Sequence, residues 1–159
     1  MGKMKKQTVD TAQTKTKETY QQMKARQETE YNSLYNELKP LVFYAFGRDQ
    51  QKKALEAYTA AGGKMDELTS TSAGLTGSRA EIMKMFKLCE RHKAEITDAL
   101  KTREFAKTAF IYEMANHEYS YTHEDADVMN ALGLDADNIP ENLRECYEEA
   151  RREYIGNAY

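Results

Sequence analysis

The sequence has no tryptophan, only two cysteines and only two prolines among its 159 residues. Two cysteines cannot crosslink a chain of this length, which excludes a disulfide-stabilised scaffold. Long apolar runs are missing too: no stretch approaches the roughly 18 consecutive apolar residues that a membrane-spanning helix needs. Neither charge sign dominates, because 23 Lys and Arg against 26 Asp and Glu leave a net charge of -3. The remaining class is a water-soluble protein of about one domain.

The few cysteines and the start of the chain suggest where the protein resides. Cys89 and Cys146 are the only cysteines, which is typical of a reducing cytoplasm. The first six residues are basic, but no apolar stretch follows them as it would in a secretory signal. Residues 1–15 are rich in Lys, Gln and Thr, so we expect a flexible polar N-terminus. We expect residues 16–159 to form a single, mostly helical domain.

Apolar residues recur at helical spacing along most of the chain. One stripe begins near residue 16 and stops before Pro40, and a second helix is expected from Asp49 to Gly62. Ser78 and Glu81 have the spacing of a capping box at the head of a longer stripe, over 79–114. That stripe fits one long helix or two consecutive ones, since it contains no proline or glycine. Further helices are expected over 123–132 and from Pro140 onward, separated from 79–114 by a short aromatic linker at 117–121.

Two short segments have the composition of strands. Residues 41–46 are apolar and rich in aromatic side chains, and residues 67–72 could pair with them. Residues 73–77 have the composition of a turn-rich loop. The fold class predicted is therefore mainly α (α+β), a helical bundle with a small two-stranded β element near residues 41–46 and 67–72.

Acidic residues are concentrated at the end of the chain. Residues 115–159 contain three Lys or Arg and eleven Asp or Glu, a net charge of -8. Tyrosines are interspersed among these carboxylates, and tyrosine is enriched at binding surfaces. An acidic face attracts a basic partner and disfavours nucleic acid. We therefore predict a protein-binding surface made by Tyr119, Tyr121, Glu145, Glu148, Glu149 and Tyr154.

Two other groups of residues have the chemistry of a site. His117 and His123, with Asp127, could ligate a divalent metal ion, although the six-residue separation of the histidines differs from the four of a His-Glu-x-x-His helix. The turn from Gly74 to Arg79 leads into a helix, where backbone N–H groups could hold a phosphate. Neither group is a recognised catalytic motif. We expect no cofactor, no bound metal and no catalytic residues.

Several segments together resemble a family of small proteins encoded by bacteriophages and prophages. They are VFYAFGRDQ at 42–50, SAG at 72–74, YEMANHEYSYT at 112–122 and ALGL at 131–134. Relatives carry a run of glycines where this chain has TSAG at 71–74. The family has no established activity, so the resemblance implies a phage or mobile-element setting and no site residues.

The expected function combines the acidic region with this resemblance. We expect an accessory protein, not an enzyme, that acts in the host-cell cytoplasm. It would bind and inhibit a host protein with a basic surface, for example a nucleic-acid-guided defence nuclease, as an anti-CRISPR protein does. Two alternatives stay open. One is a nucleic-acid or nucleotide-binding protein that uses the basic N-terminal helix and the Gly74–Arg79 turn, and the other is a metal-dependent enzyme centred on His117 and His123.

Overall fold

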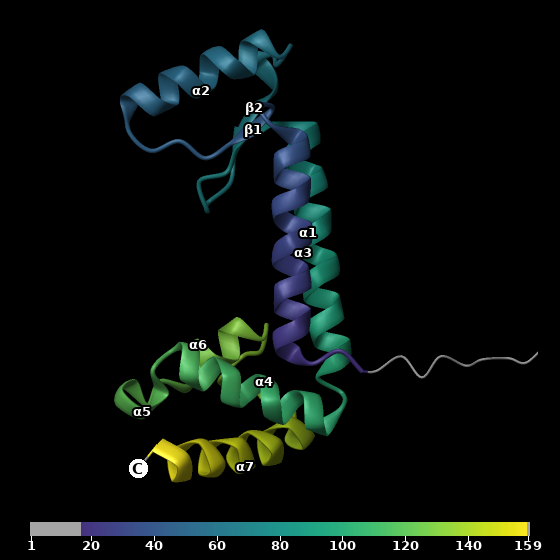
Figure 1. Ribbon diagram of the computed structural model, residues 1–159, viewed down its shortest axis with the longest axis vertical. Helices are drawn as coiled ribbons and strands as arrows, with labels where there is room; N and C mark the ends of the chain where they lie inside the picture. Colours follow the sequence, from purple (N-terminus) through teal and green to yellow (C-terminus); the bar gives the residue numbers. More distant parts are fainter. Residues whose placement is uncertain (1–16, 159) are drawn as a thin grey trace, which may run out of the picture.

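The computed structural model describes residues 17–158 (Figure 1). The N-terminus predicted to be flexible, residues 1–15, lies outside this range. The helices are α1 (Tyr20–Leu38), α2 (Arg48–Ala60), α3 (Arg79–Ala99), α4 (Arg103–Asn116), α5 (Tyr119–Thr122), α6 (Asp125–Ala131) and α7 (Glu141–Ala158). A 3-10 turn, η1 (Met65–Glu67), precedes β2 (Leu68–Ser70), and the other strands are β1 (Val42–Phe43) and β3 (Thr76–Ser78). The mainly α (α+β) class is confirmed.

Two long helices form a stalk with a lobe at each end. Helices α1 and α3 run antiparallel, and the 21 residues of α3 extend over about 31 Å (Figure 1). The sheet lobe, residues 39–78, contains α2 and the three strands. The C-terminal lobe, residues 100–158, contains α4 to α7. Both lobes project to the same side of the stalk, so the molecule has the outline of a bracket and its helices are not gathered in one bundle.

The stalk helix α1 begins and ends at local signals. Thr19 and Gln22 form a capping box in which the Thr19 hydroxyl accepts from the Gln22 N–H at 3.2 Å and the Gln22 side chain accepts from the Thr19 N–H at 2.9 Å. The first helical residue is thus Tyr20, later than the position near 16 that periodicity suggested. The helix ends at Leu38, as predicted from Pro40, because a residue before proline avoids the α region.

The sheet has three strands where two were predicted. Its order is β1-β3-β2, all antiparallel, with Gly77 opposite Val42 on one side and Thr69 on the other. The segments 41–46 and 67–72 therefore do not pair with each other; β3, from the segment predicted as a loop, lies between them. A side chain at Gly77 would place its Cβ 2.1 Å from the Leu41 carbonyl oxygen. Only glycine allows the strands to approach this closely.

The apolar segment 41–46 is mostly not a strand. Only residues 42 and 43 pair, Val42 is fully buried, and Phe46 is 76% exposed. Gly47, with a positive φ of 83°, then caps α2, which places Asp49 in the first turn and not at the N-cap as predicted. Gly62 ends this helix region with a φ of 92°, in agreement with the prediction.

The apolar stripe over 79–114 forms two helices. The chain turns between Ala99 and Arg103, and the turn places Leu100 in the core of the C-terminal lobe. No proline or glycine causes this break. Ser78 is the N-cap of α3, but its side chain makes no capping hydrogen bond, so the predicted capping box does not form; Glu81 instead pairs with Lys84 at 3.0 Å.

The last elements follow the prediction with one addition. The helix expected over 123–132 is α6, and the linker expected at 117–121 contains the helical turn α5. Helix α7 begins directly after Pro140, whose carbonyl accepts from the N–H groups of Leu143 and Arg144. Among residues 17–158, no helix has the length and apolar character that crossing a membrane requires.

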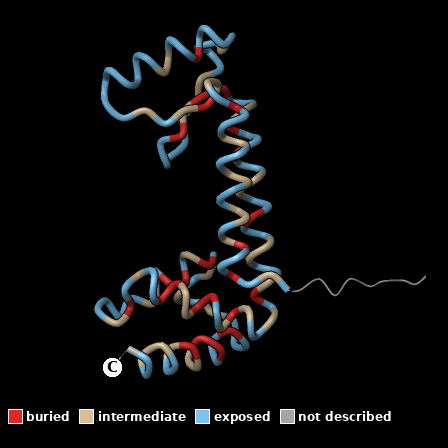
Figure 2. Tube along the Cα trace, viewed as in Figure 1, coloured by how far each residue is buried: buried red, intermediate tan, exposed pale blue. Residues whose placement is uncertain are grey.

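Two separate hydrophobic cores stabilise the lobes. The sheet-lobe core consists of Leu38, Val42, Leu75, Ile82 and Met85. The core of the C-terminal lobe is larger and is built mainly where α4 packs on α7, around Phe110, Met114, Val128, Met129, Cys146 and Ala150. Figure 2 shows buried segments gathered at the two ends of the stalk and few along its middle. The middle of the stalk must therefore be held by other contacts.

Candidate functional sites in the stalk and the C-terminal lobe

The predicted tyrosines of the binding surface have different environments. Tyr119 is only 2% exposed, its hydroxyl donates to Asp125 at 2.9 Å, and its ring packs edge-on against Tyr154. The prediction of Tyr119 as a surface contact is therefore wrong, because this side chain belongs to the core. Tyr154 is half-buried beside it. Tyr121 is 86% exposed and is fully available to a partner.

The predicted glutamates of α7 are also not equivalent. Glu148 pairs with Arg151 at 2.6 Å, and Glu149 pairs with Arg103 and with Lys107. Hydrogen bonds from Arg103 and Lys107 hold the pKa of Glu149 below its ordinary value. Glu145 is exposed and, within residues 17–158, has no cation in ion-pair range. It lies nine residues from Tyr154, or about 14 Å along the helix, so the six predicted residues do not form one compact patch.

Unpaired carboxylates occupy exposed positions across the C-terminal lobe. Residues 100–158 contain six Lys or Arg and thirteen Asp or Glu, which gives a net charge of -7. Among the described residues, several exposed carboxylates of this lobe have no Lys, Arg or His nitrogen within 4.0 Å. We call these residues, together with Tyr121, the acidic surface: Glu118, Glu124, Asp127, Asp135, Asp137, Glu141 and Glu145.

The helical turn α5, which carries Tyr121, is attached to the core of the C-terminal lobe. Glu118 and His123, which flank α5, both have left-handed backbones with φ of 51° and 52°. Such conformations are uncommon for residues other than glycine and persist where neighbouring contacts enforce them. Between these two residues, Tyr119 is held by Asp125, which accepts hydrogen bonds from the hydroxyls of Tyr119 and Tyr147. Sequence analysis missed Glu118 and Glu124 as members of this surface, although their position on either side of Tyr121 is visible in the sequence.

The histidines considered as metal ligands do not come together. His117 lies 3.3 Å from Glu113, while the ring of His123 packs edge-on against Tyr119. In the part of the chain that the structure describes, only Glu30, His92 and Glu95 bring three possible ligand atoms within 4.8 Å of one another. A metal centre at His117, His123 and Asp127 is therefore not supported by the geometry.

The predicted phosphate turn is not formed either. Gly74 lies in the loop between β2 and β3, but Gly77 is in the central strand of the sheet. The N–H of Ser78 donates to the Leu41 carbonyl at 2.9 Å. These backbone groups are used by the sheet, so they cannot surround a phosphate beside Arg79.

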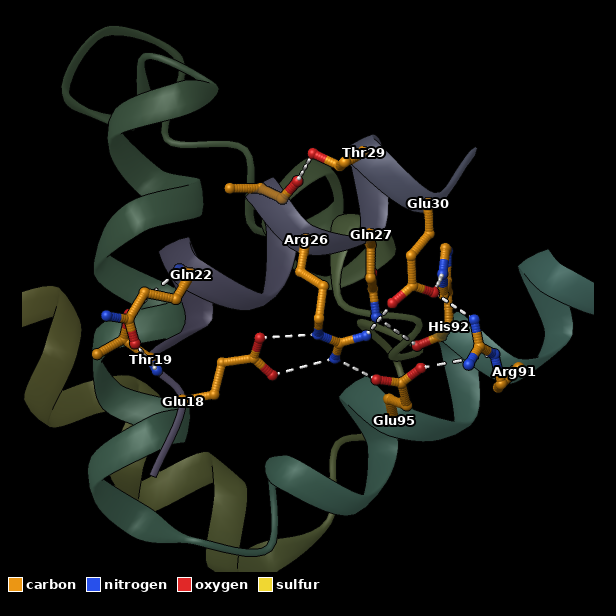
Figure 3. Close-up of polar contacts among 11 residues, drawn as sticks. Glu18, Thr19, Gln22, Arg26, Gln27, Thr29, Glu30, Arg91, His92 and Glu95 are labelled. Atoms are coloured by element: carbon orange, nitrogen blue, oxygen red, sulfur yellow. Dashed lines mark hydrogen bonds and ion pairs between the residues drawn. The ribbon is translucent and has the colours of Figure 1, made fainter. Parts of the chain in front are cut away.

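A cluster of charged side chains joins the two stalk helices in the half of the stalk nearer the C-terminal lobe (Figure 3). Arg26 is at its centre: its guanidinium donates to Glu18 at 2.8 and 3.0 Å, to Glu30 at 2.8 Å, and to Glu95 on α3. Such a planar fork can bind several carboxylates at once. We call the whole group the stalk cluster: Glu18, Arg26, Gln27, Glu30, Arg91, His92 and Glu95.

Residues of α3 complete the stalk cluster around Glu30. His92 Nε2 lies 3.0 Å from the Glu30 carboxylate, and Arg91 donates to the same oxygen. The hydrogen bonds from His92 and then from Arg26 lower the pKa of Glu30 to about 2. Gln27 donates to the His92 carbonyl at 3.1 Å. Sequence analysis missed this cluster; its signals were Gln27, which interrupts the apolar stripe, and charges at i,i+4 spacing.

The chemistry of the stalk cluster favours a structural role over metal binding. Glu30, His92 and Glu95 could ligate a cation, and Glu95 Oε1 is buried without a hydrogen-bond partner among residues 17–158. However, Arg26 and Arg91 already neutralise both carboxylates. A divalent ion would have to displace or approach two guanidinium groups. The cluster therefore connects α1 to α3 between the two hydrophobic cores.

A buried carboxylate connects α1 to the C-terminal lobe. Glu113 is fully buried on α4, where it accepts hydrogen bonds from the Tyr20 hydroxyl, from Lys24 at 2.9 Å and from Asn116 at 3.3 Å. Burial by itself would raise the pKa of Glu113, but the bonds from Tyr20 and Lys24 outweigh burial and lower it. The first turns of α1 are thereby fixed to the lobe.

The stalk cluster predicts a pH-dependent stability that involves Glu30. Because the folded-state pKa of Glu30 is lowered, its carboxylate stabilises the fold above about pH 4.5, and this contribution is lost as the pH falls toward 2. We expect Glu30→Gln to cost about 1 kcal/mol at pH 7, allowing for solvent screening, and almost nothing near pH 2. Urea denaturation at several pH values measures this. Glu28→Gln, exposed on the same helix, is the control, and an equal loss at both pH values would contradict the prediction.

Comparison with known proteins gives a family but no activity. No curated protein and no solved structure matches the chain significantly. Residues 19–153 match a family of unknown function, DUF7659. The match extends from the N-cap of α1 into α7, and so includes the stalk and both lobes. With most of its length matched, the chain belongs to the DUF7659 family.

Proposed function

We propose that the protein is a non-catalytic binding protein that docks its acidic surface onto a basic surface of a host protein and blocks it. The observation that carries the proposal is the group of exposed, unpaired carboxylates around Tyr121. Carboxylates that already pair with arginine or lysine, such as Glu149, have little charge left to offer a partner. The charges of Glu118, Glu124 and Asp127 are not paired in this way and are available to a partner.

The form of this surface supports recognition of a protein that normally binds nucleic acid. Exposed negative charge attracts a basic channel and accelerates encounter with it. Tyr121 adds a flat aromatic ring to the charges, as a base does beside phosphates. The anchoring of α5 by Asp125 reduces the entropy lost on binding, because the turn is already ordered.

The setting of the proposal comes from the resemblance to phage-encoded proteins. On that basis we propose that the protein acts in the cytoplasm of a host cell and that its partner is a host defence protein with a nucleic-acid channel, such as a guided nuclease. Inhibition by steric and electrostatic occlusion requires no active site.

Charge reversal on the acidic surface tests the proposal. We expect Glu118→Lys with Glu124→Lys to lower affinity for the partner about 10- to 100-fold, since two attractions become repulsions. The partner is first captured from host lysate, identified by mass spectrometry and purified. The chain should then displace a labelled single-stranded nucleic acid from it in a fluorescence anisotropy assay.

A matched variant separates surface recognition from net charge. Glu28→Lys with Glu37→Lys makes the same charge change on exposed positions of α1 and should leave displacement unchanged. Equal losses in both variants would show that only net charge matters. Displacement that survives reversal at Glu118 and Glu124 would show that the acidic surface is not the binding site.

A further inference from the structure

The sheet lobe contains an arm that has almost no support within its own chain. The arm, residues 44–64, comprises the segment after β1, helix α2 and the turn that follows. Tyr58 is the only buried residue of α2; its ring lies against Gly63 and Phe43, and its hydroxyl donates to the Lys64 carbonyl at 2.9 Å. The other residues of α2 are exposed or half-buried.

A helix in this situation needs a partner. At 13 residues, α2 is close to the length at which an isolated helix is only marginally stable in water. Phe46, just before it, is 76% exposed, and Leu55 lies in a surface hollow with Lys52, Glu56, Thr59 and Ala60. Apolar side chains on an otherwise unpacked helix are typical of a face that another surface covers.

The charge of the arm identifies the chemistry of that surface. The arm carries Arg48, Lys52, Lys53 and Lys64 against Asp49 and Glu56, a net charge of +2. Among the residues that the structure describes, none of these four cations has an ion-pair partner. The complementary surface is therefore acidic, and the chain has such a surface on its own C-terminal lobe.

We propose that two copies of the chain form an antiparallel dimer in which the arm of each docks on the acidic surface of the other. The arm and the C-terminal lobe project to the same side at opposite ends of the stalk (Figure 1). A two-fold axis beside the middle of the stalk therefore brings both arm-to-lobe contacts together at once. The pairing closes on itself, as in most homodimers, and leaves no open end for filament growth.

The composition of the sheet lobe favours a protein partner over nucleic acid. Its exposed large apolar residues include Phe46 and Met65, and Met83 and Phe86 are exposed on the adjoining turns of α3. Methionine and aromatic residues are enriched at protein interfaces, whereas a nucleic-acid groove is dominated by cations. The chain as a whole, at -3, repels a polyanion.

The dimer uses the acidic surface but needs no host protein. Its existence can therefore be tested independently of the proposed function. In the dimer the acidic surface is covered by the arm of the second copy. A host protein with a more basic surface would then compete with the arm for it. This last consequence rests on the proposed function: under it, the dimer is a resting form from which the inhibitor is released.

Light scattering coupled to gel filtration tests the dimer with the full chain. We expect a mass of twice 18.3 kDa at about 50 mM salt and a shift toward 18.3 kDa at about 500 mM salt, where screening weakens exposed charge pairs. Lys52→Glu with Lys53→Glu should raise the dimer dissociation constant roughly tenfold or more. Glu118→Lys with Glu124→Lys should do the same.

The decisive variant combines both reversals. With all four substitutions the arm is acidic and the opposing surface is basic at these positions. The attraction between them returns, so the combined variant should restore the dimer. The control, Lys93→Glu with Lys101→Glu, changes two exposed lysines, one on α3 and one in the turn between α3 and α4, and should leave the dimer intact. A monomer at every concentration, a dimer indifferent to salt and to the reversals, or no rescue by the combined variant would overturn the proposal. Bound nucleic acid that the Lys52 and Lys53 reversals remove would assign the arm to that ligand instead.

Discussion

Replacing Glu113 by alanine is expected to destabilise the protein by about 3–4 kcal/mol. Glu113 is fully buried and accepts a hydrogen bond from the hydroxyl of Tyr20, a residue that is itself only 2% exposed. Without the carboxylate, that hydroxyl is left in the core with no acceptor, and a cavity opens beneath α1. Lys24, whose side chain is 38% exposed, can turn to solvent and contributes less to the loss. Urea denaturation at pH 7 measures the difference.

A double-mutant cycle with Tyr20→Phe isolates the contact. If the bond between Tyr20 and Glu113 dominates, the double variant should be less destabilised than the sum of the two single variants. The pH dependence has a fixed sign: since the net shift of the Glu113 pKa is downward, its contribution is present at neutral pH and is lost as the pH falls below about 4.5. A Glu113→Ala variant within about 1 kcal/mol of the parent protein would show that this buried bond is not formed in solution.

The helices could be predicted from the sequence because their burial is periodic. Tyr20, Met23 and Leu38 are buried at helical spacing in α1. Leu143, Cys146, Tyr147 and Ala150 are buried at helical spacing in α7. The stop at Pro40 depends only on local backbone sterics. Where local backbone and side-chain preferences determine a helix or its end, the sequence was sufficient to predict it.

The sheet could not be predicted in full because tertiary contacts determine it. Residues 76–78, Thr-Gly-Ser, have the composition of a turn, yet they form the central strand. The reason is the close approach of Leu41, which only Gly77 permits and which no sequence pattern reveals. Conversely, the aromatic content of 41–46 overstated its strand length, since Tyr44 to Phe46 leave the sheet for the arm.

The candidate site was likewise only partly predictable from the sequence. Composition located the acidic region correctly, but it could not tell a free carboxylate from one that pairs with a residue distant in sequence. Glu149 pairs with Arg103, which lies 46 residues away in the sequence, and Tyr119 is buried in the core, where it donates a hydrogen bond to Asp125. The unpaired carboxylates that flank Tyr121 in the sequence are Glu118 and Glu124, which the charge count included but did not single out.

The proposed dimer depends on the stability of the stalk. The two proposed contacts, on the arm and on the acidic surface, lie at opposite ends of α1 and α3. A dimer with both contacts requires the lobes to keep a fixed separation. Since the middle of the stalk lacks a hydrophobic core, that separation depends on the stalk cluster.

Replacing Arg26 by alanine is therefore expected to cost about 2 kcal/mol and to make the two lobes unfold separately. Three carboxylates, Glu18, Glu30 and Glu95, lose the guanidinium that they share and repel one another. Hydrogen exchange followed by mass spectrometry measures the effect region by region. The sheet lobe, with the smaller core, should lose protection at lower urea concentration than the C-terminal lobe.

Arg26→Lys is the informative companion, because it keeps the charge and removes the fork. One ammonium group cannot reach carboxylates on both helices with the geometry of a guanidinium, so lysine should recover less than half of the lost stability. Full recovery by lysine would mean that charge alone holds the stalk. Simultaneous loss of protection in both lobes of the Arg26→Ala variant would mean that the cores are coupled by other contacts and that the stalk cluster does not set their spacing.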